Sequence, residues 1–112
     1  MESILLVIKQ MLGLKDTNAF DIDILAGINS AIFSLQQIGY TNGLVVTDSS
    51  QVWGNLATVS ADVGVLKSYV YLKTKLMFDP PGTSFVIDAY KNQIQEIEYR
   101  LFVASDPPMM EV

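Results

Sequence analysis

The chain has 112 residues, of which half are hydrophobic and 17% are charged, so it can form one domain with one core and is too short for two. A domain of this size has little interior, and we expect part of its apolar surface to contact partner proteins. The net charge of −5 comes from 12 acidic and 7 basic residues that form no basic run, which argues against direct binding to nucleic acid.

Cysteine and histidine are both absent from the sequence. Their absence excludes disulfides, thiolate nucleophiles and zinc sites of the usual kind, and it removes the commonest general base of enzymes. We therefore predict a protein without catalytic activity, without a cofactor and without a metal site.

The N-terminal segment predicts a short helix over residues 2–12, with Gly13 as its stop. Its apolar run, Ile4–Ile8, is preceded by Glu2 and followed by Lys9. A signal peptide has a basic start and a longer apolar run, and a membrane span needs about 20 apolar residues. We therefore expect no membrane segment and a protein that is cytoplasmic at synthesis.

Apolar residues at spacings of three and four predict a second helix over residues 19–38. We expect Thr17 or Asn18 to cap its N-terminus, because their side chains accept hydrogen bonds from free backbone N–H groups. Gly39 follows as the expected stop. The predicted core stripe of this helix is Ile24, Ile28, Ala31, Ile32 and Leu35.

Residues 40–59 interrupt the helical pattern and predict a long irregular loop. Its β-branched residues allow a short extended segment at 44–47, and residues 51–56 are compatible with a helical turn. Trp53 on that turn is either a lid over the core or an anchor in an interface. Loops of this length are usually functional or interfacial.

Two longer helices are predicted over residues 60–78 and 84–104. Ser60 is the expected cap of the first of them, and Thr83 or Ser84 is the expected cap of the second. The predicted apolar stripe of the second consists of Val86, Tyr90, Ile94, Ile97 and Leu101.

The corner between these two helices consists of Asp79, Pro80, Pro81 and Gly82. A residue before proline is pushed out of the α region, so the helix has to end at Asp79. The prolines stiffen the connection, and the glycine frees the backbone. This pattern predicts an αα-hairpin.

Together these segments predict a mainly α fold, a small four-helix domain with an αα-hairpin and one long irregular loop. We assign residues 1–104 to this single domain. Consecutive prolines prevent further helix beyond it, so residues 105–112 are expected to form an extended tail.

Two groups of polar residues are candidates for catalysis or metal binding. Asp21 and Asp23 lie two residues apart on a helix and so point to different sides, and acids are favoured at a helix N-terminus by the helix dipole. Residues 47–51 include two serines that only a lysine such as Lys67 or Lys73 could activate. Turn and cap chemistry explains the same residues, so a hydrolase or metal enzyme is the least favoured interpretation.

Four segments follow one another in a characteristic order. They are ILLVIKQMLGL, then FDIDILAGINSAIFSLQQIG, then VWGNL ahead of LKSYVYLKTKLMFDPP, and last an amphipathic helix with EIEYRL. This series, which spans nearly the whole chain, resembles the small head–tail connector (adaptor) proteins of tailed bacteriophages. The segments are architectural and contain no catalytic motif.

The resemblance implies a structural protein of the virion that is not an enzyme. Members of the family are mostly helical and form a homo-oligomeric ring, commonly of twelve copies, beneath the portal. The ring extends the DNA channel, through which DNA passes without specific binding, and it provides the surface for the stopper or tail. The implied location is the head–tail interface of the virion, with assembly in the host cytoplasm.

The resemblance also implies interface roles for particular residues. The interface candidates are Leu44, Val45, Trp53, Phe102, Met109 and Met110. The first three lie in the long loop, which would meet a neighbouring subunit or the next ring. The last three belong to the C-terminal region, which in this family commonly reaches towards the portal.

One alternative from a different class stays open. A small helical regulatory or adaptor protein could use the same apolar excess as the face of a homodimer. Light scattering separates the two, since that protein would be a dimer and a connector would form a ring.

Overall fold

The structure is a computed structural model that describes residues 2–40 and 43–105. It confirms the mainly α prediction, and the four long helices begin and end close to the predicted positions. The helices are α1 (Ile4–Met11), α2 (Asp21–Gln37), α3 (Trp53–Leu56), the 3₁₀ turn η1 (Ser60–Asp62), α4 (Val63–Phe78) and α5 (Ser84–Ser105). Residues 106–112 of the predicted tail lie outside the described part of the chain.

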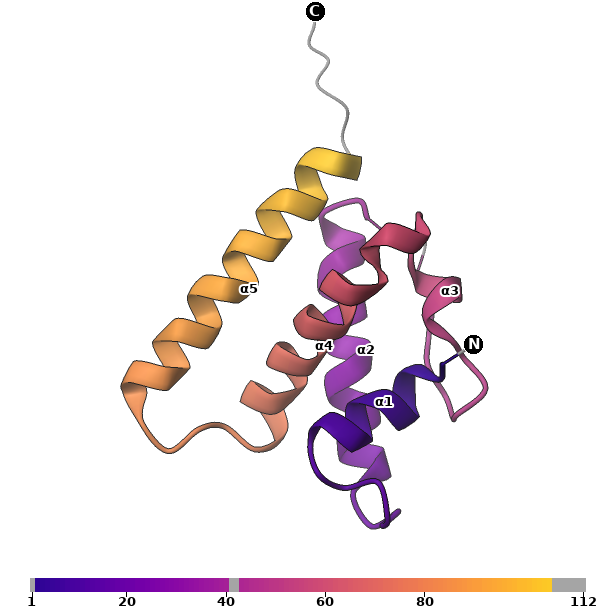
Figure 1. Cartoon of the computed structure of the whole chain (residues 1–112), viewed down its shortest axis with the longest axis vertical. Coiled ribbons are helices and arrows are strands. Elements are labelled where there is room, and N and C mark those ends of the chain that lie inside the picture. The colour runs from indigo at the N-terminus through magenta and orange to yellow at the C-terminus, as the bar shows by residue number, and fades with distance from the viewer. Residues whose placement is uncertain (1, 41–42, 106–112) are drawn as a thin grey trace, which may run out of the picture.

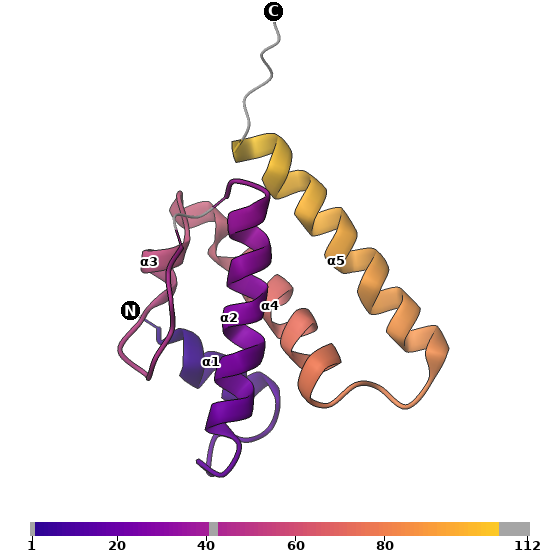
Figure 2. The same cartoon turned by 180° about the vertical axis from the view of Figure 1, so that it is seen from behind.

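Helix α4 is the central element of the arrangement (Figure 1). Helix α2 packs against it in the opposite direction, and α5 packs antiparallel on its other side, so α2 and α5 run the same way. Helix α1 crosses both α2 and α4. In both views α3 and the long loop lie on the side of the molecule opposite to α5 (Figure 2).

The core forms where α1, α2 and α4 meet. Residues Ile24, Ile28 and Leu35 of α2 are fully buried, as the predicted stripe requires. Full burial of such a side chain contributes about 1.5–3 kcal/mol. The remaining fully or nearly fully buried apolar residues come mainly from α1, α4 and the long loop, and they include Ile4, Ile8, Val46, Trp53, Leu56, Leu66, Tyr69 and Val70.

Helices α2 and α4 are in close contact at Gly27 and Thr74. A Cβ atom added to Gly27 would lie 2.9 Å from Cγ2 of Thr74, and both residues are buried. Only glycine fits this contact without a shift of one helix. Neither residue was singled out from the sequence.

Both predicted glycine stops are confirmed. Gly13 and Gly39 have φ values of +79° and +88°, a conformation that glycine adopts without the steric cost of a Cβ atom. In each case the backbone N–H groups of the glycine and of the residue after it donate to carbonyls in the last turn of the helix. At Gly39 these bonds are Gly39 N to Gln36 O at 3.0 Å and Tyr40 N to Leu35 O at 2.9 Å.

The predicted caps of the second helix are wrong. Helix α2 begins at Asp21 without a side-chain cap, and the Thr17 hydroxyl instead accepts a hydrogen bond from Ala19 N within the preceding turn. Asn18 does not cap the helix, because its side-chain oxygen accepts a hydrogen bond from the Lys9 ammonium at 2.9 Å. Lys9 is buried and also pairs with Asp21 at 2.9 Å.

The caps at the other two helices differ from each other. Ser60 starts the 3₁₀ turn, and α4 proper begins at Val63 without a side-chain cap, so the prediction for Ser60 is wrong. The carboxylate of Asp62 is used elsewhere, since it accepts a hydrogen bond from Tyr40 Oη at 2.5 Å. Thr83 caps α5 as predicted, accepting a hydrogen bond from Val86 N at 3.4 Å.

The predicted corner is confirmed in the backbone. Helix α4 ends at Phe78, and Asp79 leaves the α region with φ −148° and ψ 69°. Its carboxylate pairs with Lys75 at 3.0 Å, one turn back on the helix. The five-residue connection from Asp79 to Thr83 turns the chain into α5, which completes the αα-hairpin.

The long loop forms no strand within the described residues. Residues 44–47 are irregular because Asn29 of α2 holds them: its side-chain oxygen accepts from Val46 N at 2.8 Å and its amide donates to Val46 O at 2.9 Å. An isolated β-bridge joins Ser3 to Val52, further along the loop. The loop is therefore tied to both α2 and the N-terminus.

Candidate assembly interface

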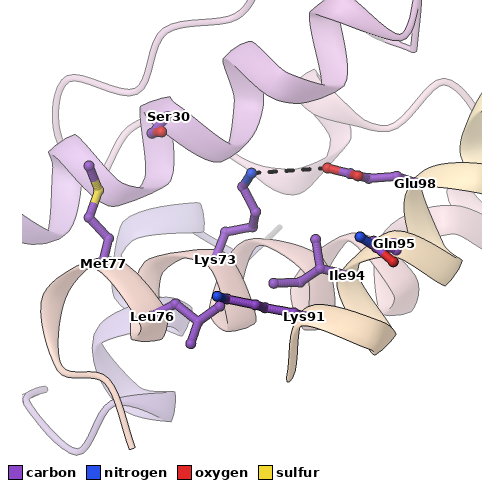
Figure 3. Close-up of a pocket in the computed structure, with 8 residues that line it drawn as sticks. All are labelled: Ser30, Lys73, Leu76, Met77, Lys91, Ile94, Gln95 and Glu98. Carbon is purple, nitrogen blue, oxygen red and sulfur yellow. Dashed lines mark ion pairs between the residues drawn. The ribbon is translucent and has the colours of Figure 1, made fainter. Parts of the chain in front are cut away.

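A groove lies between α2, α4 and α5, with a cavity volume of about 460 Å³ (Figure 3). Its apolar floor is formed by Leu76 and Met77 of α4 and Ile94 of α5. The cavity exists because α5 packs mainly on α4 and leaves the space towards α2 unfilled. The other lining residues are Ser30, Lys73, Lys91, Gln95 and Glu98.

A polar junction closes one end of this groove. Tyr69 Oη donates a hydrogen bond to Glu98 Oε2 at 2.6 Å, which joins α4 to α5. Lys73 Nζ donates to Ser34 Oγ at 3.1 Å and lies 4.0 Å from Glu98 Oε2, which joins α4 to α2. The same ammonium lies 5.9 Å from the centre of the Tyr69 ring. Three helices therefore meet through one set of polar contacts.

The junction strongly perturbs Tyr69. Burial is the largest cause that raises the pKa of its phenol, and the hydrogen bond to Glu98 and the negative charge of that carboxylate raise the pKa further. The hydroxyl therefore stays protonated and remains a donor over the whole physiological range.

Most cations of the chain are neutralised by a partner on the same molecule. Ion pairs join Lys9 to Asp21, Lys67 to Glu2, Lys73 to Glu98, Lys75 to Asp79 and Arg100 to Glu96. Within the described residues, Lys91 and Lys15 have no ion pair. Lys91 lies in the groove, so the groove presents a positive charge in an otherwise acidic protein.

A second cavity of about 400 Å³ borders the first at Met77, which lines both. Phe20 and Phe78 form its aromatic part, with ring centres 5.5 Å apart in an edge-to-face arrangement. Ala26 and Asp23 of α2 complete its walls. We call the two cavities together the inter-helix groove.

The opposite side of α5 carries large side chains that nothing in the described chain covers. Phe85 is 82% exposed and Tyr99 is 68% exposed, and Val103 is also exposed. Their spacing of 14 and 18 residues from Phe85 places all three on one side of the helix. Asn92 and Glu96 lie on the same side, and we call these five residues the outer stripe.

The interface residues predicted from the sequence lie in different environments. Trp53 is only 1% exposed and packs in the core, and Leu44 is partly buried against it. Val45 and Phe102 are exposed. Met109 and Met110 lie outside the described residues. The surface that sequence reasoning missed is the inter-helix groove, which three separate helices create together.

Most of the polar groups that could carry chemistry have structural partners. Asp21 pairs with Lys9, Lys67 pairs with Glu2, and Lys73 bonds to Ser34. The Ser50 hydroxyl donates to Asp48 at 2.5 Å in an exposed turn, and this hydrogen bond is the main cause that lowers the pKa of Asp48.

Among the residues that the structure describes, no three acidic side chains gather closely enough to hold a metal ion. No described helix combines the length and the apolar composition needed to cross a bilayer.

The fold and its surfaces thus define a small helical protein whose distinctive features are apolar surfaces suited to protein contacts. A family model described as phage connector protein matches residues 4–108. Because the match covers almost the whole chain, the protein belongs to the phage connector family, which consists of structural components of the bacteriophage virion at the head–tail junction. No curated protein and no solved structure matches the chain.

Proposed function

We propose that the protein forms a ring of twelve copies beneath the portal, extends the DNA channel, and joins the filled head to the stopper or tail. The observation that carries this proposal is the presence of two separate apolar surfaces on one small domain, the inter-helix groove and the outer stripe of α5. Two different contact surfaces suit a subunit that has neighbours on two sides.

The charge distribution supports a channel that lets DNA slide. The chain is acidic overall, and most of its cations are held in ion pairs, so few remain to bind phosphates. This pattern supports a channel without specific affinity for DNA. The proposed protein is a non-enzymatic component of the virion that is assembled in the host cytoplasm.

The assignment of surfaces to partners follows the two ends of the molecule. We place the end of α5, with exposed Phe102 and the segment 105–112 that includes Met109 and Met110, against the portal. Exposed Val45, with Leu44 beside it, would meet a neighbouring subunit or the next ring. The domain itself comprises residues 1–104 and the tail residues 105–112, with Ser105 as the last helical residue of α5.

The ring is tested with the full-length chain and purified portal. Mass photometry and negative-stain images should show rings, either of the chain alone or of the chain on portal. A chain that stays monomeric and never binds portal would contradict the proposal. A stable dimer without affinity for portal would support the homodimeric regulator instead.

The portal contact has its own test. Phe102→Ser should lower the amount of protein retained on portal. The matched control is Leu6→Ser, at another exposed apolar residue, and it should leave retention unchanged. Equal retention of both variants would remove Phe102 from the portal contact.

A further inference from the structure

Helix α5 has two faces with different uses. Its inner face buries Ile94 and Leu101 against the rest of the domain. Its outer stripe points the other way and carries Phe85, Tyr99 and Val103, which are apolar and exposed. Exposed aromatic side chains of this size are typical anchors of protein interfaces.

The outer stripe has the dimensions of a helix-docking surface. At 1.5 Å per residue, Phe85 and Tyr99 are separated by about 21 Å along the helix, and the five members of the stripe fall within about 60° of arc. Glu96 lies in the middle of this stripe and Asp88 lies beside it. Asp88 has no ion pair within the described residues.

The inter-helix groove carries a positive charge on Lys91. Its α2 wall runs from Phe20 to Ser30, about 15 Å along the helix, and the lining residues of α5 continue it. Ala26 and Ser30 are small and exposed, which allows another helix to approach closely. The ammonium of Lys91 lies in the groove without a carboxylate partner among the described residues.

The charges that face the groove are not all of one sign. Lys73 and Glu98 neutralise each other at one end, and Asp23 lies at the other end. Within the described residues, Lys91 between these ends has no ion pair, and neither does Asp23. Asp88, beside the aromatic side chains of the outer stripe, complements Lys91, whereas Glu96 is already paired with Arg100 on its own helix.

We propose that the outer stripe of α5 in one copy packs into the inter-helix groove of a second copy. This inference rests on the proposed ring and names the contact that builds it. The two surfaces are different, so the contact is head-to-tail: each copy offers its stripe to one neighbour and its groove to the other. Such a contact repeats around an axis and closes into a ring when the rotation allows.

Two variants of the full-length chain separate the two surfaces. Met77→Asp places a charge on the groove floor, and Phe85→Ser combined with Tyr99→Ser removes the anchors of the stripe. All three positions are mostly exposed, so the fold should survive, and circular dichroism with thermal unfolding checks this. Leu6→Ser is the control at an exposed apolar residue that belongs to neither surface.

Sedimentation velocity on the wild type and on each variant measures self-association of the free protein. If oligomers form only on portal, the number of copies retained on portal is compared between the same variants. Each variant alone should associate at least tenfold more weakly than the wild type, and the control should associate normally. An equimolar mixture of the groove variant and the stripe variant should form a dimer of one copy each and nothing larger. Only one intact stripe and one intact groove can meet in that mixture.

The outcomes distinguish this inference from the proposed ring. If the wild type and both variants assemble equally well, the stripe-to-groove contact is wrong, but the proposed ring is not contradicted. Variants that fail alone and also fail to pair when mixed overturn the head-to-tail arrangement. A wild-type chain that is monomeric both alone and with portal overturns the ring and the contact together.

Discussion

Helices α2 and α5 both pack on α4, yet they do so in different ways. Helix α2 buries an uninterrupted row of apolar residues and approaches α4 so closely that Gly27 admits no side chain. Helix α5 is longer but buries far less, and a polar junction at Glu98 provides much of its attachment. The first arrangement fixes the domain, whereas the second leaves surface for other chains.

The largest loss of stability is expected from changes in the buried side of α2. Ile28→Ala should lower the free energy of unfolding by about 2–5 kcal/mol, because a fully buried side chain is replaced by a cavity. Urea unfolding measures the change. Ile22→Ala is the matched control on the same helix, since Ile22 is 84% exposed and its loss should cost less than about 0.5 kcal/mol. Equal effects would mean that α2 is not anchored through this stripe.

The next effect is expected at the junction of α5. Tyr69→Phe removes the hydrogen bond to Glu98 and should destabilise the protein by about 1.5–3 kcal/mol, the range for hydrogen bonds to charged groups. Tyr99→Phe, at an exposed tyrosine on α5, is the control and should have almost no effect. Hydrogen exchange should show the loss concentrated in α5 amides. A uniform loss would argue that α5 unfolds only with the whole domain.

The same tyrosine predicts a dependence of stability on alkaline pH. In the folded protein the pKa of Tyr69 is raised above its ordinary value near 10, so its contribution is fully present below pH 10. As the pH rises above 10, the unfolded chain releases the proton while the folded chain retains it, and stability falls. Tyr69→Phe should make this decline shallower in thermal unfolding measured between pH 9 and pH 11. An unchanged slope would assign the decline to other groups.

A smaller effect tests the close contact of α2 and α4. Gly27→Ala should destabilise by about 1–3 kcal/mol, because the new Cβ atom meets Thr74 and the helices have to move apart. Gly64→Ala is the control on α4, where nothing lies within 4 Å, and it should be neutral or stabilising by up to about 1 kcal/mol. A neutral Gly27→Ala would show that the helices can separate freely.

The smallest effect is expected at the start of α5. Thr83→Ala removes the cap and should cost about 0.5–1 kcal/mol, at the low end for caps because its hydrogen bond to Val86 is long. Ser84→Ala tests the other sequence candidate and should cost less. If Ser84→Ala is the more damaging change, the cap of α5 is Ser84 and not Thr83.

The sequence predicts the helices well because helix formation depends on local spacing. Apolar periodicity defines α2, and the glycines at 13 and 39 mark helix ends through backbone conformation alone. The predicted cap at Thr17 fails for a local reason, since its hydroxyl accepts from Ala19 in the preceding turn, but the cap at Asn18 fails for a non-local one. Asn18 bonds to Lys9 on another helix, a contact that no local rule contains.

The interface is harder to predict because it is assembled from distant segments. Trp53 lies in an irregular loop, which suggests exposure, but the bridge from Ser3 to Val52 folds that loop over the core and buries the indole. The groove requires α2, α4 and α5 to be placed relative to one another. Spacing within each helix predicts which side is apolar, but not which side a neighbouring helix leaves uncovered.

The attachment of the N-terminus to the long loop has a consequence for the order of folding. Glu2 and Lys67 form an ion pair although they are 65 positions apart, whereas the bond between Tyr69 and Glu98 spans 29. Contacts between distant positions carry the larger cost of loop closure, so they form late. We therefore expect the α4–α5 hairpin to form early in folding. Packing of α1 and of the long loop over Trp53 is expected to be the last step.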